Sequence, residues 1–178
     1  MAGNRYKTVG FAGEEEWAEI PWIEIMDKQL SRFPNTAVAV KYLLNKDAKK
    51  LYLALTVGFK TIETKIIKNG GPDTEKARGV MVAEELRKIV AEIRSTVNPG
   101  TFSYDDDGID LNDERFASGI AFYREYVGVV PGDNLLETDL AEMLEIYDAY
   151  YHRCVLKELP EGLETKENAA PALCSIRK

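Results

Sequence analysis

Residues 38–57 read VAVKYLLNKDAKKLYLALTV, and this stretch decides the fold. Its first half places large apolar side chains at every second position, namely Val38, Val40, Tyr42 and Leu44. After a turn at residues 45–47, the second half does the same with Leu51, Leu53, Leu55 and Val57. Alternation of this kind is typical of a strand with one buried face. The stretch therefore predicts two antiparallel strands joined by a hairpin.

The segments on either side of the hairpin have different periods. Before it, apolar residues recur at helical spacing, at Trp17, Ile20, Ile23, Met26, Leu30 and Phe33. Because Pro21 suits the first turn of a helix, we expect a helix over residues 21–33. After the hairpin, residues 61–66 alternate between an Ile/Thr face and a Thr/Glu/Lys face. This second pattern predicts a third strand, which would complete an antiparallel meander.

A long amphipathic helix follows the Gly-Gly-Pro sequence at residues 70–72. Its apolar stripe consists of Val82, Leu86, Ile89, Val90, Ile93 and Val97. Glutamates and a lysine lie opposite, and Asn-Pro-Gly at residues 98–100 ends the helix. The one-sided stripe predicts packing against the buried face of the meander.

The second half of the chain adds one strand and one helix to this plan. Residues 115–127 fit either period, but Gly119 and the aromatic residues favour a strand. Residues 134–156 carry a second apolar stripe and predict another long helix. We therefore expect an α+β fold: a three-stranded antiparallel meander extended by a further strand, with long helices packed on one face. Residues 1–159 would form one domain and residues 160–178 a tail.

The charge of the chain is unevenly distributed along its 178 residues. Residues 1–100 hold 16 Lys and Arg against 13 Asp and Glu, whereas residues 101–178 hold 7 against 17. An acidic half argues against nucleic-acid binding through phosphate neutralisation. Cys154 and Cys174 form no disulfide framework, and the sole histidine, His152, makes a zinc site improbable. No apolar run is long enough for a membrane helix, so we expect a soluble, intracellular protein without a cofactor.

The most acidic segment lies at residues 105–114, DDDGIDLNDE. If Gly108 takes the sixth position of a calcium loop, Asp105, Asp107 and Glu114 fall on ligand positions. Ser103 at the first position and Asp110 at the eighth do not fit that pattern. The segment is more typical of a solvated acidic loop, in which Asp106 is one more surface charge.

One set of residues points to catalysis. Asp47, Glu63 and Lys65 follow the acid…Glu-x-Lys pattern of metal-dependent nucleases. Such enzymes need two carboxylates around a divalent ion and a lysine near the attacking water. A glutamate and a lysine that alternate on an exposed strand face are also common in proteins without this activity. The nuclease interpretation is therefore an alternative, and our leading hypothesis is a protein that is not an enzyme.

The leading hypothesis comes from a resemblance. Residues 32–43, RFPNTAVAVKYL, and residues 103–108, SYDDDG, resemble segments of the tail-terminator and tail-completion proteins of long-tailed bacteriophages. That resemblance implies a ring of copies, often six, which caps the tail tube, joins the head-side connector and lets DNA pass. It also implies a location in the tail or neck of the virion, and in the host cytoplasm before assembly.

A ring needs two different contact patches on each copy, and the charge pattern suggests both. The positive patch would be the hairpin lysines, Lys41, Lys46, Lys49 and Lys50. The negative patch would be the second long helix or the acidic loop, through Glu142, Glu145, Asp148, Asp105, Asp106 and Asp107. An acidic protein that binds a basic partner, or imitates DNA, is the other alternative.

Overall fold

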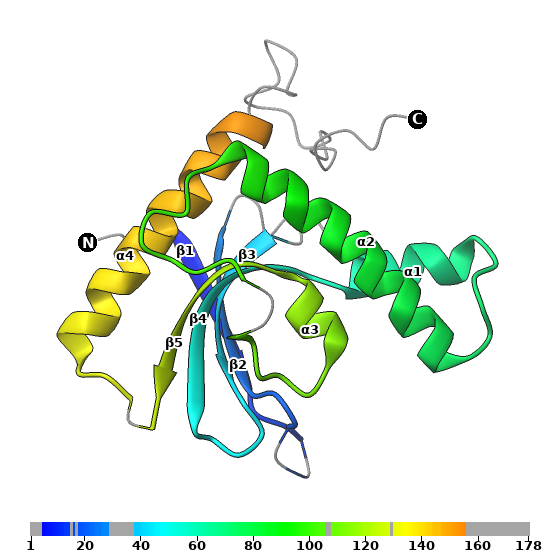
Figure 1. Ribbon diagram of the computed structural model, residues 1–178, viewed down its shortest axis with the longest axis horizontal. Helices are drawn as coiled ribbons and strands as arrows, with labels where there is room; N and C mark the ends of the chain where they lie inside the picture. The colour runs from blue at the N-terminus through cyan, green and yellow to red at the C-terminus, as the bar shows by residue number, and fades with distance from the viewer. Residues whose placement is uncertain are drawn as a thin grey trace.

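A computed structural model describes residues 5–14, 16, 18–28, 38–105, 108–128 and 130–155. Its strands form one antiparallel sheet in the order β1-β2-β3-β4-β5 (Figure 1). Their bounds are β1 Tyr6–Phe11, β2 Trp22–Asp27, β3 Val38–Leu44, β4 Lys50–Val57 and β5 Ile120–Val127. Consecutive strands are neighbours throughout, so the sheet is a five-stranded meander. The predicted α+β class, with a meander and long helices, is confirmed.

The helices are of unequal length. Their bounds are α1 Lys60–Lys68, α2 Glu75–Thr96, α3 Glu114–Ser118 and α4 Asp133–Tyr150, after which a π-helical turn covers Tyr151–Val155. The 22-residue α2 and the 18-residue α4 cross the same face of the sheet (Figure 1). Within the described ranges, no helix combines the length and the apolar character needed to cross a membrane.

The main core lies between the sheet and these two long helices. The stripe predicted for residues 82–97 is buried in it, because Val82, Leu86, Ile89, Val90, Ile93 and Val97 all face inward. From the sheet come Val40, Leu53, Leu55 and Phe122, and from α4 come Met143, Ile146 and Tyr147. Burial of this many large side chains is the main stabilising contribution to the fold.

A smaller core lies on the other face of the sheet. Leu43, Tyr52 and Tyr123 meet there, and Ile109, Leu111 and Phe116 pack over them. The segment at residues 108–119 therefore covers β3, β4 and β5 on the face opposite α2 and α4. Ile109 and Leu111 fix this segment to the sheet, whereas the side chains of Asp105, Asp110 and Glu114 are exposed.

The helix predicted over residues 21–33 is wrong for its described part. Residues 22–27 form β2, which pairs with β1 on one side and β3 on the other. Ile25 lies opposite Val40 and is buried, so its side chain faces the core as a strand residue. The sequence WIEIMD satisfies both periods over such a short span, and pairing with distant strands decides between them.

The strand predicted over residues 61–66 is also wrong, because this segment is the helix α1. Ile62 and Ile66 lie one helical turn apart and are both buried. Thr61 and Thr64 gave the segment its strand-like composition, but packing of the isoleucines outweighs that preference. The place next to β4 is taken instead by β5.

Both patterns in residues 115–127 are present, one after the other. Residues 114–118 form α3, and the predicted strand begins at Ile120. Gly119 joins the two elements and accepts a hydrogen bond from the N–H of Val57 at 2.7 Å. The hairpin is as predicted, with Leu44 opposite Leu51.

Candidate interaction site

The three residues of the nuclease pattern are not brought together. Asp47 precedes β4 and Glu63 follows it, and eight residues of extended chain span roughly 26 Å. The Asp47 carboxylate pairs with Lys49 at 2.8 Å, and that of Glu63 lies 3.7 Å from Arg115. Lys65 is exposed on α1. Two carboxylates this far apart cannot share one ion, so the pattern loses its chemical basis.

The residues of the calcium-loop pattern are not arranged as metal ligands where the structure describes them. Glu114, its twelfth residue, begins α3 and pairs with Arg87 at 2.6 Å. Asp105 is exposed, whereas Asp106 and Asp107 lie outside the described residues. In the part of the chain that the structure describes, no three His, Cys, Asp or Glu side chains are grouped as metal ligands.

Each of the hairpin lysines has a partner within the chain. Lys41 pairs with Glu24 at 2.7 Å and lies over the ring of Trp22. The other pairs are Lys46 with Glu19, Lys49 with Asp47, and Lys50 with Glu125. The exposed pairs, Lys46 with Glu19 and Lys49 with Asp47, contribute less than about 1 kcal/mol each. Their contact with a neighbouring copy stays a prediction, but their charge is already partly balanced.

The inner carboxylates of α4 are held by two arginines from the sheet side. Arg5 donates two hydrogen bonds of 2.7 Å to Asp148 and a third to Asp27. Arg124 donates to Asp139, whose other oxygen accepts from Tyr126 at 2.7 Å. Like charges along one helix repel each other, and on the inner side of α4 these arginines of the same chain offset that repulsion.

Burial and these carboxylates also raise the pKa of the tyrosines that contact them. Burial is the main reason that the pKa of Tyr126 is raised, and its hydrogen bond to Asp139 adds to the effect. Burial and the negative charge of Asp148 raise the pKa of Tyr6 to about 12. Both hydroxyls therefore stay protonated and donate to their carboxylates at neutral pH.

The outer side of α4 is different, because its acids lack such partners. Asp133, Glu137 and Glu145 form no ion pair with any described residue, and Glu142 lies 3.7 Å from Arg124. Between residues 130 and 150 there are six Asp and Glu and no Lys or Arg. This side of the helix is a negatively charged surface with no balancing charge on the helix itself.

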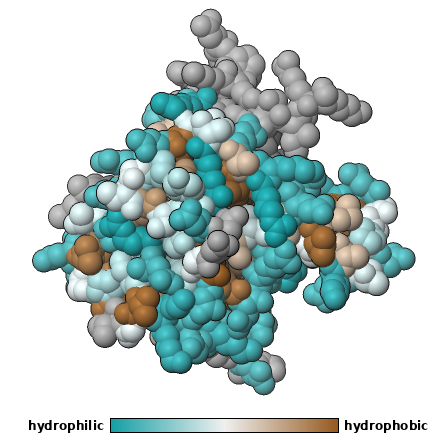
Figure 2. All heavy atoms as spheres, in the orientation of Figure 1, coloured by the Kyte–Doolittle hydropathy of each residue, from teal (hydrophilic) through white to brown (hydrophobic). Residues whose placement is uncertain are grey.

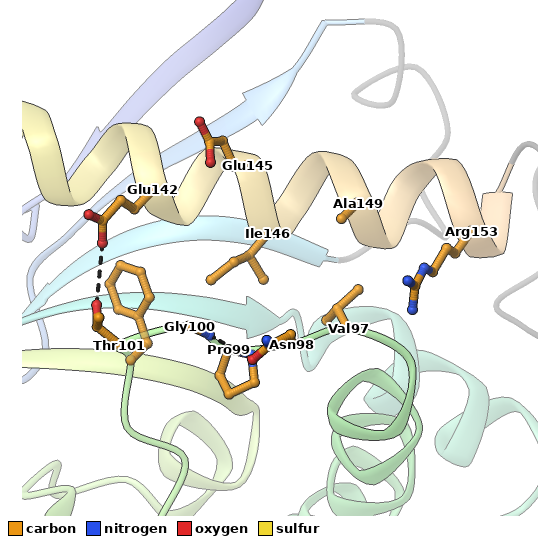
Figure 3. Close-up of a pocket in the computed structure, with 11 residues that line it drawn as sticks. Val97, Asn98, Pro99, Gly100, Thr101, Glu142, Glu145, Ile146, Ala149 and Arg153 are labelled. Carbon is orange, nitrogen blue, oxygen red and sulfur yellow. Dashed lines mark hydrogen bonds between the residues drawn. The ribbon is translucent and has the colours of Figure 1, made fainter.

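A pocket of about 520 Å³ opens beside this surface, between α4 and the loop at residues 97–102 (Figure 3). Glu142 and Glu145 line it together with Ile146 and Arg153. The Thr101 hydroxyl donates to Glu142 at 3.3 Å, and Arg153 donates to the carbonyl oxygen of Thr96. The groups that line the pocket thus include two carboxylates, a hydroxyl and a guanidinium, which offer charge and hydrogen bonds to a bound molecule.

Four lysines at the opposite end of the molecule are also unpaired among the described residues. These are Lys60, Lys65 and Lys68 on α1 and Lys76 at the start of α2. Figure 1 shows α1 and the beginning of α2 extending away from the sheet, far from the start of α4. This surface was not predicted from the sequence, because the strand-like composition of residues 61–66 placed them in the sheet. The only signal was the number of lysines between residues 60 and 76.

A third exposed feature lies on the sheet face opposite the long helices. The rings of Phe11 and Trp22 are 6.0 Å apart, on neighbouring strands. Val9 and Lys7 are exposed on the same face of β1 as Phe11. β1 is an edge strand, so this aromatic patch lies at the margin of the sheet.

Comparison with known proteins gives one relation. No curated protein and no solved structure matches the chain. The family model described as "MrcB-like, N-terminal domain" matches residues 1–152, which include all the described strands and the helices α1 to α4. That description names no activity, ligand or partner. The chain therefore belongs to the MrcB-like N-terminal domain family.

Proposed function

We propose that the protein is a non-catalytic assembly module that associates with further copies of itself. The specific form that we propose, on the resemblance described above, is a ring in the tail or neck of a phage. The matched family neither names such a role nor excludes it.

One observation carries the proposal: unpaired charges of opposite sign lie on separate parts of the fold. The outer side of α4 has Asp133, Glu137 and Glu145, and the α1 region has unpaired lysines. A charged surface whose groups have no partner among the described residues is suited to a partner of opposite charge. A second copy of this chain supplies a basic surface for the acidic one and an acidic surface for the basic one.

The arrangement also favours repeated association over a closed pair. When two different patches of one protein are complementary, each copy keeps one free patch after the first contact. Addition continues until the copies close into a ring or extend as a filament. A ring is what the tail or neck role requires.

Native mass spectrometry and negative-stain electron microscopy of the purified chain test this proposal together. We expect masses at a multiple of the 20.0 kDa chain and closed particles of one size. Binding only to an added basic protein, with no self-association, would instead favour the alternative of an acidic binding protein. A single mass of one chain at low salt contradicts the proposal.

A second candidate function is favoured by the aromatic patch of Phe11 and Trp22. Phe11 is exposed beside the half-buried Trp22, and an exposed ring on a sheet face can stack with the bases of single-stranded nucleic acid, at about 1–3 kcal/mol per base. The net charge of −7 gives little attraction to phosphate, so stacking would have to supply most of the affinity.

Fluorescence anisotropy of a labelled single-stranded oligonucleotide tests this second candidate. If it is right, the chain binds and Phe11→Ala weakens binding, whereas Val130→Ala, at an exposed site on another part of the molecule, does not. Absence of binding at low salt would remove the candidate.

A further inference from the structure

We propose that the contact between copies joins the α1 region of one copy to the start of α4 in the next. The inference rests on the proposed self-association and adds the surfaces that make it. We call them the basic end and the acidic end, and each combines unpaired charges with exposed apolar side chains.

The basic end contains the four unpaired lysines of α1 and α2, together with apolar residues that face solvent. The apolar members are Ile67 on α1 and Val80 and Met81 on α2. Ile67 is 54% exposed although its neighbour Ile66 is buried, so it contributes nothing to the core. Between residues 60 and 78 there are five Lys and Arg against three Asp and Glu, which leaves the region positive.

The acidic end lies where β5 leads into α4. Its unpaired acids are Asp133 and Glu137, with Glu145 further along the same helix. Its exposed apolar residues are Val127, Val130 and Leu135, each at least half exposed. Figure 2 shows hydrophobic side chains in brown over the start of α4 and the end of β5, and others over the first half of α2.

The two surfaces complement each other in both respects that matter for binding. Stable interfaces have an apolar centre surrounded by polar and charged groups, and each end has this composition. Opposite charges at the rim bring the partners together quickly and reject the wrong pairing, in which two acidic ends would meet. Two basic ends would be rejected for the same reason.

The position of the two ends excludes contact within one copy. In Figure 1 the basic end lies on the right and the start of α4 on the left, with the sheet between them. Each end must therefore find its partner on another copy. The interface joins two different patches, which is the arrangement that gives rings.

The unpaired lysines distinguish this interface from one made by the hairpin lysines. Lys49 pairs with Asp47 at 2.8 Å and Lys50 with Glu125 at 3.1 Å, so a new acidic partner would have to compete with an existing one. Lys65 and Lys68 have no such partner among the described residues. Their charge is available to a neighbour at no loss of an internal pair.

Two double variants test the interface through sedimentation velocity of the full chain at low salt. Lys65→Glu with Lys68→Glu reverses the basic end, and Glu137→Lys with Glu145→Lys reverses the acidic end. All four positions are exposed, and circular dichroism confirms that each variant is folded. We expect each double variant alone to self-associate at least about tenfold more weakly than the unmodified chain.

Mixing the two variants in equal amounts provides the decisive step. One variant then has two acidic ends and the other two basic ends, so every contact between unlike variants joins opposite charges. We expect association to return in the mixture. Lys49→Glu with Lys50→Glu is the matched control, and we expect it to leave self-association within about twofold.

The outcomes separate the interface from the proposed function. If the unmodified chain self-associates but neither double variant weakens it, or the mixture stays monomeric, this interface is wrong and self-association stands. If the hairpin control is the variant that dissociates, the contact lies at the hairpin instead. If the unmodified chain does not self-associate, the proposed function fails as well.

Discussion

Asp139 is a carboxyl group inside the protein, with 1% of its surface exposed. It accepts hydrogen bonds from Arg124 and from Tyr126, so its charge is balanced and both oxygens have donors. Removing the carboxylate leaves the guanidinium and the tyrosine hydroxyl without their acceptor. We expect Asp139→Ala to lower the free energy of unfolding by about 3 kcal/mol, measured by urea denaturation.

Glu137 provides the matched control, since it is exposed and lies on the same helix. Glu137→Ala should change the free energy of unfolding by less than about 0.5 kcal/mol. Equal effects of the two substitutions would show that Asp139 does not stabilise the join between β5 and α4.

Tyr52 gives a prediction for alkaline pH. Its buried side chain donates a hydrogen bond to Glu125 at 2.9 Å, and burial raises its pKa from 10.0 to about 12. Because the pKa is higher in the folded state, the stabilisation is fully present below pH 10 and is lost as the pH rises towards 12. We expect the free energy of unfolding to fall across this interval, and to fall less in Tyr52→Phe.

Urea denaturation at several pH values measures both slopes. Tyr104→Phe, at an exposed tyrosine, is the control. Its free energy of unfolding should fall with pH as steeply as that of the unmodified chain. If the free energy of unfolding fell equally steeply in Tyr52→Phe, Tyr52 would not be the cause of the alkaline loss of stability.

Residue-level contacts of this kind could not be predicted from the sequence. Arg5 and Asp148 are separated by 143 positions, and nothing in the spacing of either residue marks the other. The acids of α4 could be identified from the sequence as a negative patch. That arginines of the same chain hold two of them could not be predicted, because this depends on the packing of α4 over the sheet.

At the scale of elements, Gly119 fixes the junction between α3 and β5. A Cβ atom at this position would lie 2.7 Å from the carbonyl oxygen of Val57, closer than such atoms approach. The backbone of β4 or β5 would have to move. We expect Gly119→Ala to lower the free energy of unfolding by about 1–3 kcal/mol, measured by thermal or urea denaturation.

Gly79 in α2 makes the opposite prediction and serves as the comparison. No atom lies within 4 Å of a Cβ atom built there. Alanine favours a helix over glycine by about 0.8–1.0 kcal/mol, so Gly79→Ala should stabilise the protein. Effects of the same sign at both glycines would contradict this account of the α3–β5 junction.

Elements with a long or unambiguous period were predictable, and short ones were not. β3, β4, α2 and α4 follow their apolar patterns, because each has many inward-facing positions. β1 could not be predicted, since almost all of its side chains are exposed and no apolar alternation marks it. For residues 22–27 and 60–68, neighbouring elements rather than local preference determine the structure.

For the whole molecule, the unequal charge of the two halves was visible in the sequence, but its location in space was not. The hairpin lysines were chosen because they are close together in the chain, yet the structure pairs them internally. The unpaired lysines lie on α1, which the sequence suggested was a strand. Both charged ends become recognisable only after the ion pairs are known.

Association through opposite charges should also depend on salt. The Debye length shortens from about 10 Å at 0.1 M salt to about 3 Å at 1 M, which screens exposed charges. Contacts between the exposed apolar residues of the two ends are not screened by salt, so they should preserve part of the binding energy at high salt. We therefore expect weaker, but measurable, self-association at 1 M salt.

The central claim is that copies of this chain bind one another through the two charged ends. Sedimentation velocity of the unmodified chain, over a concentration series at low and at high salt, tests it most directly. We predict species larger than the 20.0 kDa chain at low salt, and a shift towards that mass at about 1 M salt. A sedimentation coefficient of one chain at every concentration at low salt would contradict the claim.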